Sequence, residues 1–380
     1  MKNKTTFNFF IIFIIISSCF AISACNKSSN DSKENDVDNV VMLSLSTDGK
    51  YAVTTNMDNR AYIWKINQQA HRRIGVKPVN TYSAYFISQS QNILIQNAET
   101  NEVYIEDIAG NVIKTINPGF QVFGEAISSD LKTYIAAGES YNVYKFDLET
   151  QKRQQLFVSW CDVKGTSSTY DKDNPYYGDL PNGCAGFSGS LPNFTFTKDN
   201  QYLVFNAGEP ITIWNLSENT WDQVDKTAWP NVTAITPDNH SLLVAGKNQL
   251  GYEYSFSTKS KSPVFNWNEA NNESASSINF ISQKYIVMTM AGENNQSQVH
   301  LFNVKDITNQ SKASFDEIKV VDLKSNQEKL YPKTQSYFPT VATSIESNRL
   351  VMAQADGNGI IVYKFNPKDL TFEIDWVSEL

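Results

Sequence analysis

LSLSTDGKYAVTT, residues 43–55, is the stretch that decides the fold. Apolar and polar residues alternate on both sides of the turn Asp48-Gly49, which is the pattern of an antiparallel β-hairpin. The unit, an apolar strand, a polar turn and a second strand, returns as FISQSQNILIQ (86–96), AISSDLKTYIAA (126–137), FTFTKDNQYLVF (194–205), AITPDNHSLLVA (234–245), NFISQKYIVMTM (279–290) and ATSIESNRLVMA (342–353). The chain therefore contains seven related hairpins.

A second unit follows each hairpin, beginning with AYIWKI at residues 61–66. Its later copies are VYIEDI, NVYKFDL, ITIWNL, YEYSF, VHLFNV and IIVYKF. When Trp64, Glu106, Tyr144, Trp214, Tyr254, Phe302 and Tyr363 are taken as equivalent, the successive spacings are 42, 38, 70, 40, 48 and 61 residues. Four of these spacings lie near the roughly 40 to 45 residues of a WD-repeat blade, and the other two indicate a blade plus an insertion.

These repeats predict an all-β fold, a β-propeller of about seven blades with four antiparallel strands each. In the first blade we expect strands at 40–46, 51–55 and 61–66, and a fourth near 71–76. Helical periodicity is nearly absent, which excludes α/β folds. Residues 371–376 alternate like a last strand, so we expect each blade to be built from contiguous chain, with blade 7 packed directly against blade 1.

The segments Ser46-Thr47-Asp48-Gly49-Lys50 and Asp58-Asn59-Arg60-Ala61-Tyr62-Ile63-Trp64 resemble the WD-repeat propellers. This resemblance covers nearly the whole chain after the N-terminal segment. The Gly-His pair of that family is missing, and Trp stands at the family position only in blades 1 and 4. We therefore expect the family's internal Asp-His-Ser-Trp hydrogen-bond network to be absent.

The N-terminus predicts export and lipidation. Lys2 and Lys4 precede an apolar run at 9–16 that is shorter than the roughly 20 residues of a membrane span, as in a secretory signal. Ile22-Ser23-Ala24-Cys25 resembles the bacterial lipobox, which implies a signal peptide at 1–24 and acyl chains, such as palmitate, on Cys25. The alternative is an ordinary signal cleaved after Ala24. Asn26 follows the cysteine where Asp would favour the inner membrane, so we expect a lipoprotein of the outer membrane that faces the periplasm.

Composition separates a tether from the folded domain. Residues 25–39 hold the lipidated cysteine and a polar segment with one apolar residue, Val37, which predicts a flexible tether. The propeller then spans 40–380. The net charge of −8 becomes −10 once the signal and its two lysines are removed, which argues against nucleic acid as a partner.

Two cysteines remain in the domain, Cys161 and Cys184, with 22 residues between them. An oxidising periplasm favours a disulfide bond, and closing the loop stabilises by roughly 3 kcal/mol. A metal site is the alternative, but no further Cys or His lies close by in the sequence. Within the loop, Asp171, Asp173 and Asp179 are a candidate calcium site, although a solvated acidic loop is the preferred interpretation.

No spacing of residues indicates catalysis. The three histidines, His71, His240 and His300, fall in different blades, which gives neither a Ser-His-Asp arrangement nor a metal cluster. The innermost strands carry small residues such as Ala84 and Ala126, where a channel enzyme would need convergent charged groups. We predict no enzymatic activity and no cofactor.

The predicted function is a membrane-anchored scaffold that binds a protein of the bacterial envelope. The alternative is a small-ligand receptor or an enzyme that uses the central channel, in the manner of lactonases or quinoproteins. Two insertions, 160–192 between blades 3 and 4 and 325–339 between blades 6 and 7, should lie on one face. That candidate partner face carries Trp160, Tyr170, Tyr176, Tyr177, Trp229, Trp267, Tyr331, Tyr337 and Phe338. The same rings have an alternative role, which is to pack the insertions onto the propeller.

Overall fold

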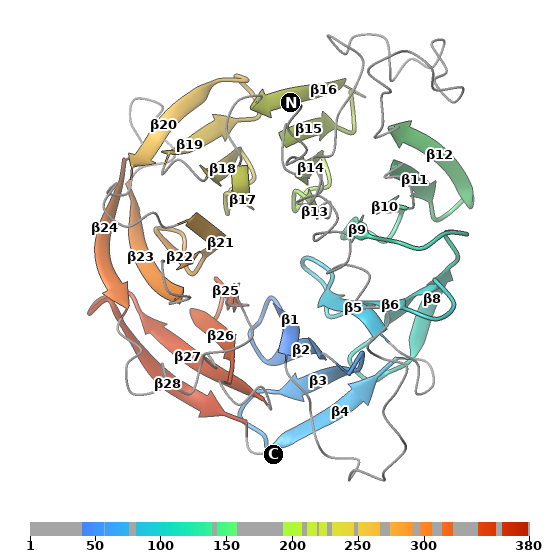
Figure 1. Cartoon of the computed structure of the whole chain (residues 1–380), viewed down its shortest axis with the longest axis horizontal. Coiled ribbons are helices and arrows are strands. Elements are labelled where there is room, and N and C mark those ends of the chain that lie inside the picture. Colours follow the sequence, from blue (N-terminus) through green and yellow to red (C-terminus); the bar gives the residue numbers. More distant parts are fainter. Residues whose placement is uncertain are drawn as a thin grey trace, which may run out of the picture. The chain divides into compact units, whose positions relative to one another are not determined.

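The computed structural model describes residues 40–378, apart from 57, 76–80, 139–142, 158–192, 207–210, 219, 226–229, 247–249, 267–273, 292–296, 306–313, 322–340 and 355–358. The chain divides into two units, Met1–Asp36 and Val37–Leu380, and all described residues belong to the second. That unit is a ring of seven four-stranded antiparallel sheets, in which the first strand of each sheet is innermost (Figure 1). The seven-bladed all-β prediction is confirmed.

Each blade consists of four strands that are consecutive in sequence. Blade 1 contains β1 (Val40–Leu45), β2 (Tyr51–Asn56), β3 (Ala61–Lys65) and β4 (Ala70–Ile74), and blade 2 contains β5 (Thr81–Phe86), β6 (Ile93–Asn97), β7 (Val103–Glu106) and β8 (Val112–Ile116). Blade 3 contains β9 (Gly124–Ile127), β10 (Thr133–Ala137), β11 (Val143–Asp147) and β12 (Lys152–Phe157), and blade 4 contains β13 (Asn193–Phe196), β14 (Tyr202–Asn206), β15 (Ile211–Asn215) and β16 (Thr220–Asp225). Blade 5 contains β17 (Pro230–Ile235), β18 (Ser241–Gly246), β19 (Leu250–Ser255) and β20 (Lys261–Asn266). Blade 6 contains β21 (Ser274–Phe280), β22 (Tyr285–Ala291), β23 (Ser297–Lys305) and β24 (Ser314–Val321), and blade 7 contains β25 (Val341–Ser344), β26 (Arg349–Ala353), β27 (Ile360–Asn366) and β28 (Thr371–Val377).

Side-chain hydrogen bonds in the first turn of blades 1, 3, 4 and 5 explain why these segments form hairpins. In blade 1, Ser46 Oγ donates to Asp48 Oδ1 at 2.8 Å and accepts the backbone N–H of Tyr51 at 2.9 Å. Asp48 in turn accepts the N–H of Lys50 at 3.0 Å. Side-chain bonds of this local kind favour a turn over continued strand. Blades 3, 4 and 5 repeat the first of these contacts with Ser128–Asp130, Thr197–Asp199 and Thr236–Asp238, each at 2.6 Å.

The hydrophobic core is divided into seven clusters, and each cluster lies between two neighbouring blades. The cluster between blades 1 and 2 contains Val53 and Ile63 from the first and Phe86 and Ile93 from the second. The other six clusters join blades 2 to 3, 3 to 4, 4 to 5, 5 to 6, 6 to 7 and 7 to 1. Because each sheet buries apolar side chains on both faces, the apolar surface of the blades is buried only when the ring is closed.

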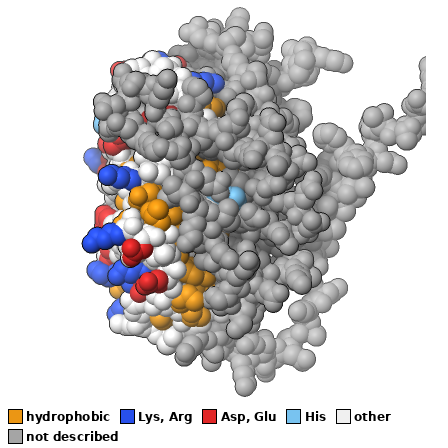
Figure 2. Space-filling model, turned by 90° about the vertical axis from the view of Figure 1, so that its left-hand side faces the viewer, with side chains coloured by type: hydrophobic (Ala, Val, Ile, Leu, Met, Phe, Trp, Pro, Cys, Tyr) orange, Lys and Arg blue, Asp and Glu red, His pale blue; other side chains and the backbone are white. Residues whose placement is uncertain are grey.

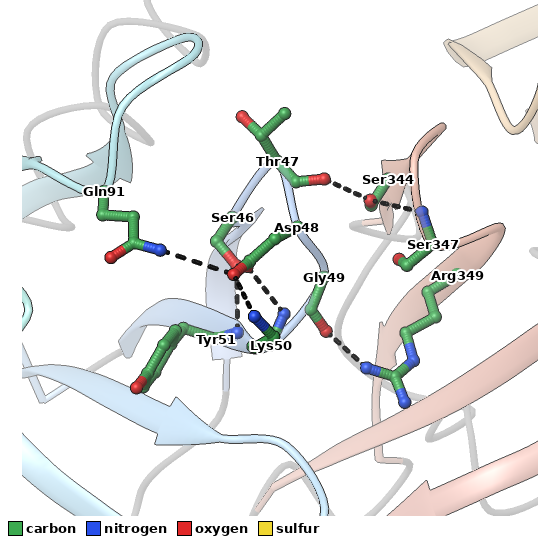
Figure 3. Close-up of polar contacts among 10 residues, drawn as sticks. All are labelled: Ser46, Thr47, Asp48, Gly49, Lys50, Tyr51, Gln91, Ser344, Ser347 and Arg349. Carbon is green, nitrogen blue, oxygen red and sulfur yellow. Dashed lines mark hydrogen bonds and ion pairs between the residues drawn. The ribbon is translucent and has the colours of Figure 1, made fainter.

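The ring closes by side-chain and backbone contacts between blade 7 and blade 1. Ser344 Oγ donates to the carbonyl of Thr47 at 2.6 Å, and the Arg349 guanidinium donates to the carbonyl of Gly49 at 2.7 Å (Figure 3). Arg349 also forms an ion pair with Asp375 at 2.6 Å. All four strands of blade 7 come from 341–377, so the predicted closure without strand exchange is confirmed.

Trp64 Nε1 donates to Thr54 Oγ1 at 3.0 Å, and Thr54 Oγ1 donates to Asn56 Oδ1 at 3.0 Å, so blade 1 has a tryptophan–hydroxyl contact. The Asp and the His of the family network take no part in these two hydrogen bonds. One detail of the sequence interpretation is wrong. In blade 3, the residue equivalent to Trp64 is Phe146 and not Tyr144. Phe146 pairs with Tyr134, the second residue of β10, as Trp64 pairs with Ala52, the second residue of β2.

The described part of the surface seen in Figure 2 mixes charged and hydrophobic side chains. Figure 2 shows lysine and arginine side chains interspersed with aspartate and glutamate side chains along one edge of the view, with hydrophobic side chains between them. Exposed ion pairs include Lys50–Asp48 at 3.1 Å and Lys132–Glu149 at 3.2 Å, a class of contact that adds little stability. Within the residues that the structure describes, none belongs to a helix that is long and apolar enough to cross a membrane.

Candidate functional site

Most of the residues singled out in the sequence lie outside the described residues. These are the lipidation candidate Cys25, the disulfide candidates Cys161 and Cys184, the calcium candidates Asp171, Asp173 and Asp179, and the partner-face residues Trp160, Tyr170, Tyr176, Tyr177, Trp229, Trp267, Tyr331, Tyr337 and Phe338. The roles assigned to them stay predictions.

The three histidines are described, and they lie in three different blades. His71 on β4 packs against the Trp64 ring, tilted by 31° with 4.7 Å between the ring centroids, and burial lowers the pKa of His71. His240 is exposed in the turn between β17 and β18, beside Asp238 at 3.4 Å. His300 on β23 is buried and stacked on Phe302. Across the described ranges, no three His, Cys, Asp or Glu side chains are grouped so that they could hold a metal ion.

The innermost strands are built almost wholly from uncharged residues. Their side chains pack between blades: Ala84, Ala126 and Ala342 are buried in three different interblade clusters. Within the described bounds of β1, β5, β9, β13, β17, β21 and β25, one residue has a charged side chain, Glu125 on β9. Glu125 therefore carries the one carboxylic acid among the residues of these described strands.

Neutral hydroxyl groups from two blades hold the Glu125 carboxyl. Tyr134 Oη on the neighbouring strand β10 donates to Glu125 Oε2 at 2.6 Å. Ser83 Oγ, on β5 of blade 2, donates to Glu125 Oε1 at 2.8 Å. Tyr85 Oη, also on β5, donates to the Glu125 backbone carbonyl at 3.3 Å. The carboxyl thus lies at the interface between blades 2 and 3.

Burial raises the pKa of the Glu125 carboxyl to about 7, and the hydrogen bonds from Tyr134 and Ser83 oppose that shift. Desolvation dominates because neither donor carries a charge that would stabilise the carboxylate. The same burial, together with the nearby Glu125, raises the pKa values of Tyr134 and Tyr85 well above the ordinary value for a phenol. Both tyrosines therefore stay protonated donors at physiological pH.

A signal for Glu125 was present in the sequence. Glu125 lies three residues before Ser128, the first residue of its turn. The equivalent residues in the other six blades are Leu43, Ala84, Phe194, Thr233, Ile278 and Val341. A carboxylate where six copies have an uncharged residue is an exception to the pattern. Its hydroxyl partners could not be found in this way, because Ser83 lies 42 residues away in the chain.

No protein-family model matches this chain, and no curated protein matches its sequence. Among solved structures, it is similar to the crystal structure of the β-propeller domain of Myceliophteria thermophila Cps50 (Swd1). The TM-score is 0.60 at 10% sequence identity, and the likeness covers 87% of this chain and 98% of that domain. The chain therefore has a WD40-like β-propeller fold. At this level of identity the likeness shows the fold alone.

Proposed function

We propose that this protein is a lipid-anchored, non-enzymatic propeller scaffold that binds a protein partner in the bacterial envelope. The N-terminal sequence supports the anchor and the compartment, through the apolar run at 9–16 and the lipobox-like residues up to Cys25. The propeller supports the scaffold role, since seven interblade cores hold its loops on a rigid ring.

The observation that carries the proposal is the composition of the inner wall. Its described strands offer backbone, small, aliphatic, aromatic and hydroxyl side chains and the single carboxyl of Glu125. Lactonase-like or quinoprotein-like chemistry in a channel would need several charged or metal-binding groups converging from different blades. Recognition by the exposed turns and connections is the better use of this architecture.

Strand direction supports the proposed partner face. Residues 158–192 connect β12 to β13, and 322–340 connect β24 to β25, so both segments join an outermost strand to the next innermost strand. In antiparallel four-stranded blades all such connections leave from the same face of the ring, opposite the turn at Ser46 and its equivalents. We propose that the aromatic residues of these connections, Tyr176 and Tyr337 among them, contact the partner.

Crosslinking in intact envelopes tests this function. Purification of the crosslinked, lipid-anchored protein should recover one specific envelope protein, and the pair Tyr176→Ala and Tyr337→Ala should reduce that recovery at least several-fold without lowering thermal stability. The matched control is the pair Lys132→Ala and Glu149→Ala, which removes an exposed ion pair on the opposite face and should leave recovery unchanged. Full recovery with the aromatic variants, or loss with the control pair, would place the binding surface elsewhere.

Anchoring is tested separately. Replacement of Cys25→Ser should abolish the incorporation of labelled fatty acid and release the protein from membranes, because the sulfur that accepts the diacylglycerol is gone. Fatty acid still incorporated into the variant would contradict the proposed lipidation site. The measurement does not depend on the identity of the partner, so the two parts of the proposal can fail independently.

A further inference from the structure

The Glu125 carboxyl belongs to a hydrogen-bond chain that crosses between blades 3 and 2. Ser83 Oγ lies 2.8 Å from Glu125 Oε1 and 3.3 Å from Gln96 Oε1 on β6. Gln96 Nε2 donates to the carbonyl of Val122 at 2.8 Å, and this bond decides which end of the amide faces Ser83. Ser83, Gln96 and Val122 are all buried.

One proton decides the direction of this chain. A serine hydroxyl has a single hydrogen, so Ser83 can donate either to Glu125 or to Gln96 but not to both. When Glu125 is ionised, the carboxylate is the stronger acceptor and takes that hydrogen bond. The buried Gln96 Oε1 then loses its hydrogen bond from Ser83, which is the one donor described for this oxygen. Leaving a buried acceptor without a donor costs free energy of folding.

Tyr134 decides which carboxyl oxygen takes an added proton. Its fully buried hydroxyl donates to Glu125 Oε2, and that oxygen must stay an acceptor for the bond to persist. An added proton therefore resides on Oε1, where it faces Ser83. The carboxyl then donates to Ser83 Oγ, and the serine hydroxyl rotates to donate to Gln96 Oε1.

We propose that Glu125, Ser83 and Gln96 form a proton-operated hydrogen-bond switch across the interface of blades 2 and 3. Proton uptake from solvent by Oε1 completes an unbroken chain from Tyr134 through Glu125, Ser83 and Gln96 to Val122, and proton release breaks it at Ser83. The interface is tighter in the protonated state. No covalent chemistry is involved.

The surroundings of Glu125 place the switch near neutral pH. Among the described residues, the titratable groups that face it are the phenols of Tyr134 on β10 and Tyr85 on β5, and both remain protonated near neutral pH. Strand β13, which packs on β9, has the sequence Asn-Phe-Thr-Phe and contributes no charge. The folded-state pKa of about 7 lies above the ordinary value of 4.5 for a glutamate side chain. Between those two values the folded protein holds more protons than the unfolded chain, so stability falls as pH rises through this window.

The variant Glu125→Gln tests the switch in the full chain. Its carbonyl oxygen can accept from Tyr134 and its amide can donate to Ser83, so it should behave as the protonated state at every pH. We expect the infrared band of a protonated carboxyl in wild type, lost with a midpoint near pH 7 and absent in the variant. From pH 5 to pH 8, the melting temperature of the wild type should fall by a few degrees relative to that of Glu125→Gln. Over the same range, amide hydrogen exchange in β5, β6 and β9 of the wild type should become faster than in the variant at equal pH.

Ser83→Ala separates a relay from simple burial. It removes the atom that links the two blades but keeps the carboxyl buried, so Glu125 should still titrate while the pH-dependent protection of β6 disappears. Glu373→Gln, on the exposed face of β28, is the matched control and should change none of these readouts. The proposal is overturned if the carboxyl band is already lost near pH 5, if wild type and Glu125→Gln differ equally at all pH values, or if Ser83→Ala keeps the pH-dependent protection of β6.

Discussion

At the scale of single residues, one buried position of the third strand is occupied by different kinds of side chain in different blades. Trp64 in blade 1 is 1% exposed, and its indole N–H donates to Thr54 on the neighbouring strand. Blade 2 has Glu106 at the equivalent position, where burial raises the pKa of the carboxyl against the opposing effects of the Gly75 backbone N–H and the Arg72 charge. A buried polar group needs such a partner wherever it stands.

Thr54→Val is the prediction that follows. The substitution keeps the side-chain volume but removes the acceptor of the Trp64 indole, so the variant should lose about 1 to 3 kcal/mol of stability. Trp64→Phe, made alone and together with Thr54→Val, completes a double-mutant cycle measured by thermal unfolding. If the hydrogen bond carries the cost, the Thr54 substitution should cost clearly less in the Trp64→Phe background. Strict additivity would argue against it.

At the scale of elements, the first turn of six of the seven blades contains one residue with positive φ. Asn200 and Asn239 have φ values of 58° and 64°, as suits a side chain that tolerates the left-handed region. Blade 1 has Gly49, with φ of 68°. The reason lies in blade 7: a Cβ at position 49 would lie 2.7 Å from Ser347 Cβ and closer still to its Oγ (Figure 3). This turn is adapted to the closing interface as well as to its own hairpin.

Gly49→Asn tests that explanation, because asparagine accepts the same φ elsewhere in the ring. Overpacking at the interface should cost about 1 to 3 kcal/mol, measured as a lower thermal midpoint. Ser347→Gly should recover most of the loss in the double variant, since it removes the atoms that the new Cβ meets. Without such recovery, strain in the turn itself would have to be the cause.

At the scale of the whole molecule, closure of the ring rests on blade 7 meeting blade 1. The shared cluster includes Leu45 and Trp64 from one side and Val351 and Val362 from the other, and Trp376 of β28 packs against it. Arg349 adds its ion pair with Asp375 and its bond to the Gly49 carbonyl. Among the described residues, all four strands of blade 7 come from 341–377 and all four strands of blade 1 from 40–74.

Removal of residues 25–39 from the mature chain should therefore leave the melting temperature of the domain unchanged to within about 1 °C, whereas removal of 371–378 should unfold it. The deletion of β28 takes away Trp376 and Asp375 and exposes the apolar face of blade 7. Calorimetry and circular dichroism of the two secreted proteins would decide. A marked loss from the N-terminal deletion would point to a closure that involves those residues.

The sequence by itself determined the repeating hairpins, the number of blades and the contiguous strand order. These follow from local physics: alternation of apolar residues, the Ser46–Asp48 type of turn, and spacings near 40 residues. The equivalence of Tyr144 with Trp64 went wrong because Tyr144 and Phe146 are two aromatic residues in alternate positions of one strand. Only the pairing of β10 with β11 distinguishes them.

The tertiary structure alone decided what joins one blade to the next. The bond between Arg349 and the Gly49 carbonyl links residues 300 positions apart, and the contact of Ser83 with Glu125 spans 42. No local pattern encodes such pairs, since they depend on which turns and inner strands the closed ring brings together. The pKa of Glu125 has the same origin, because desolvation is a property of the assembled interface and not of the strand that carries the residue.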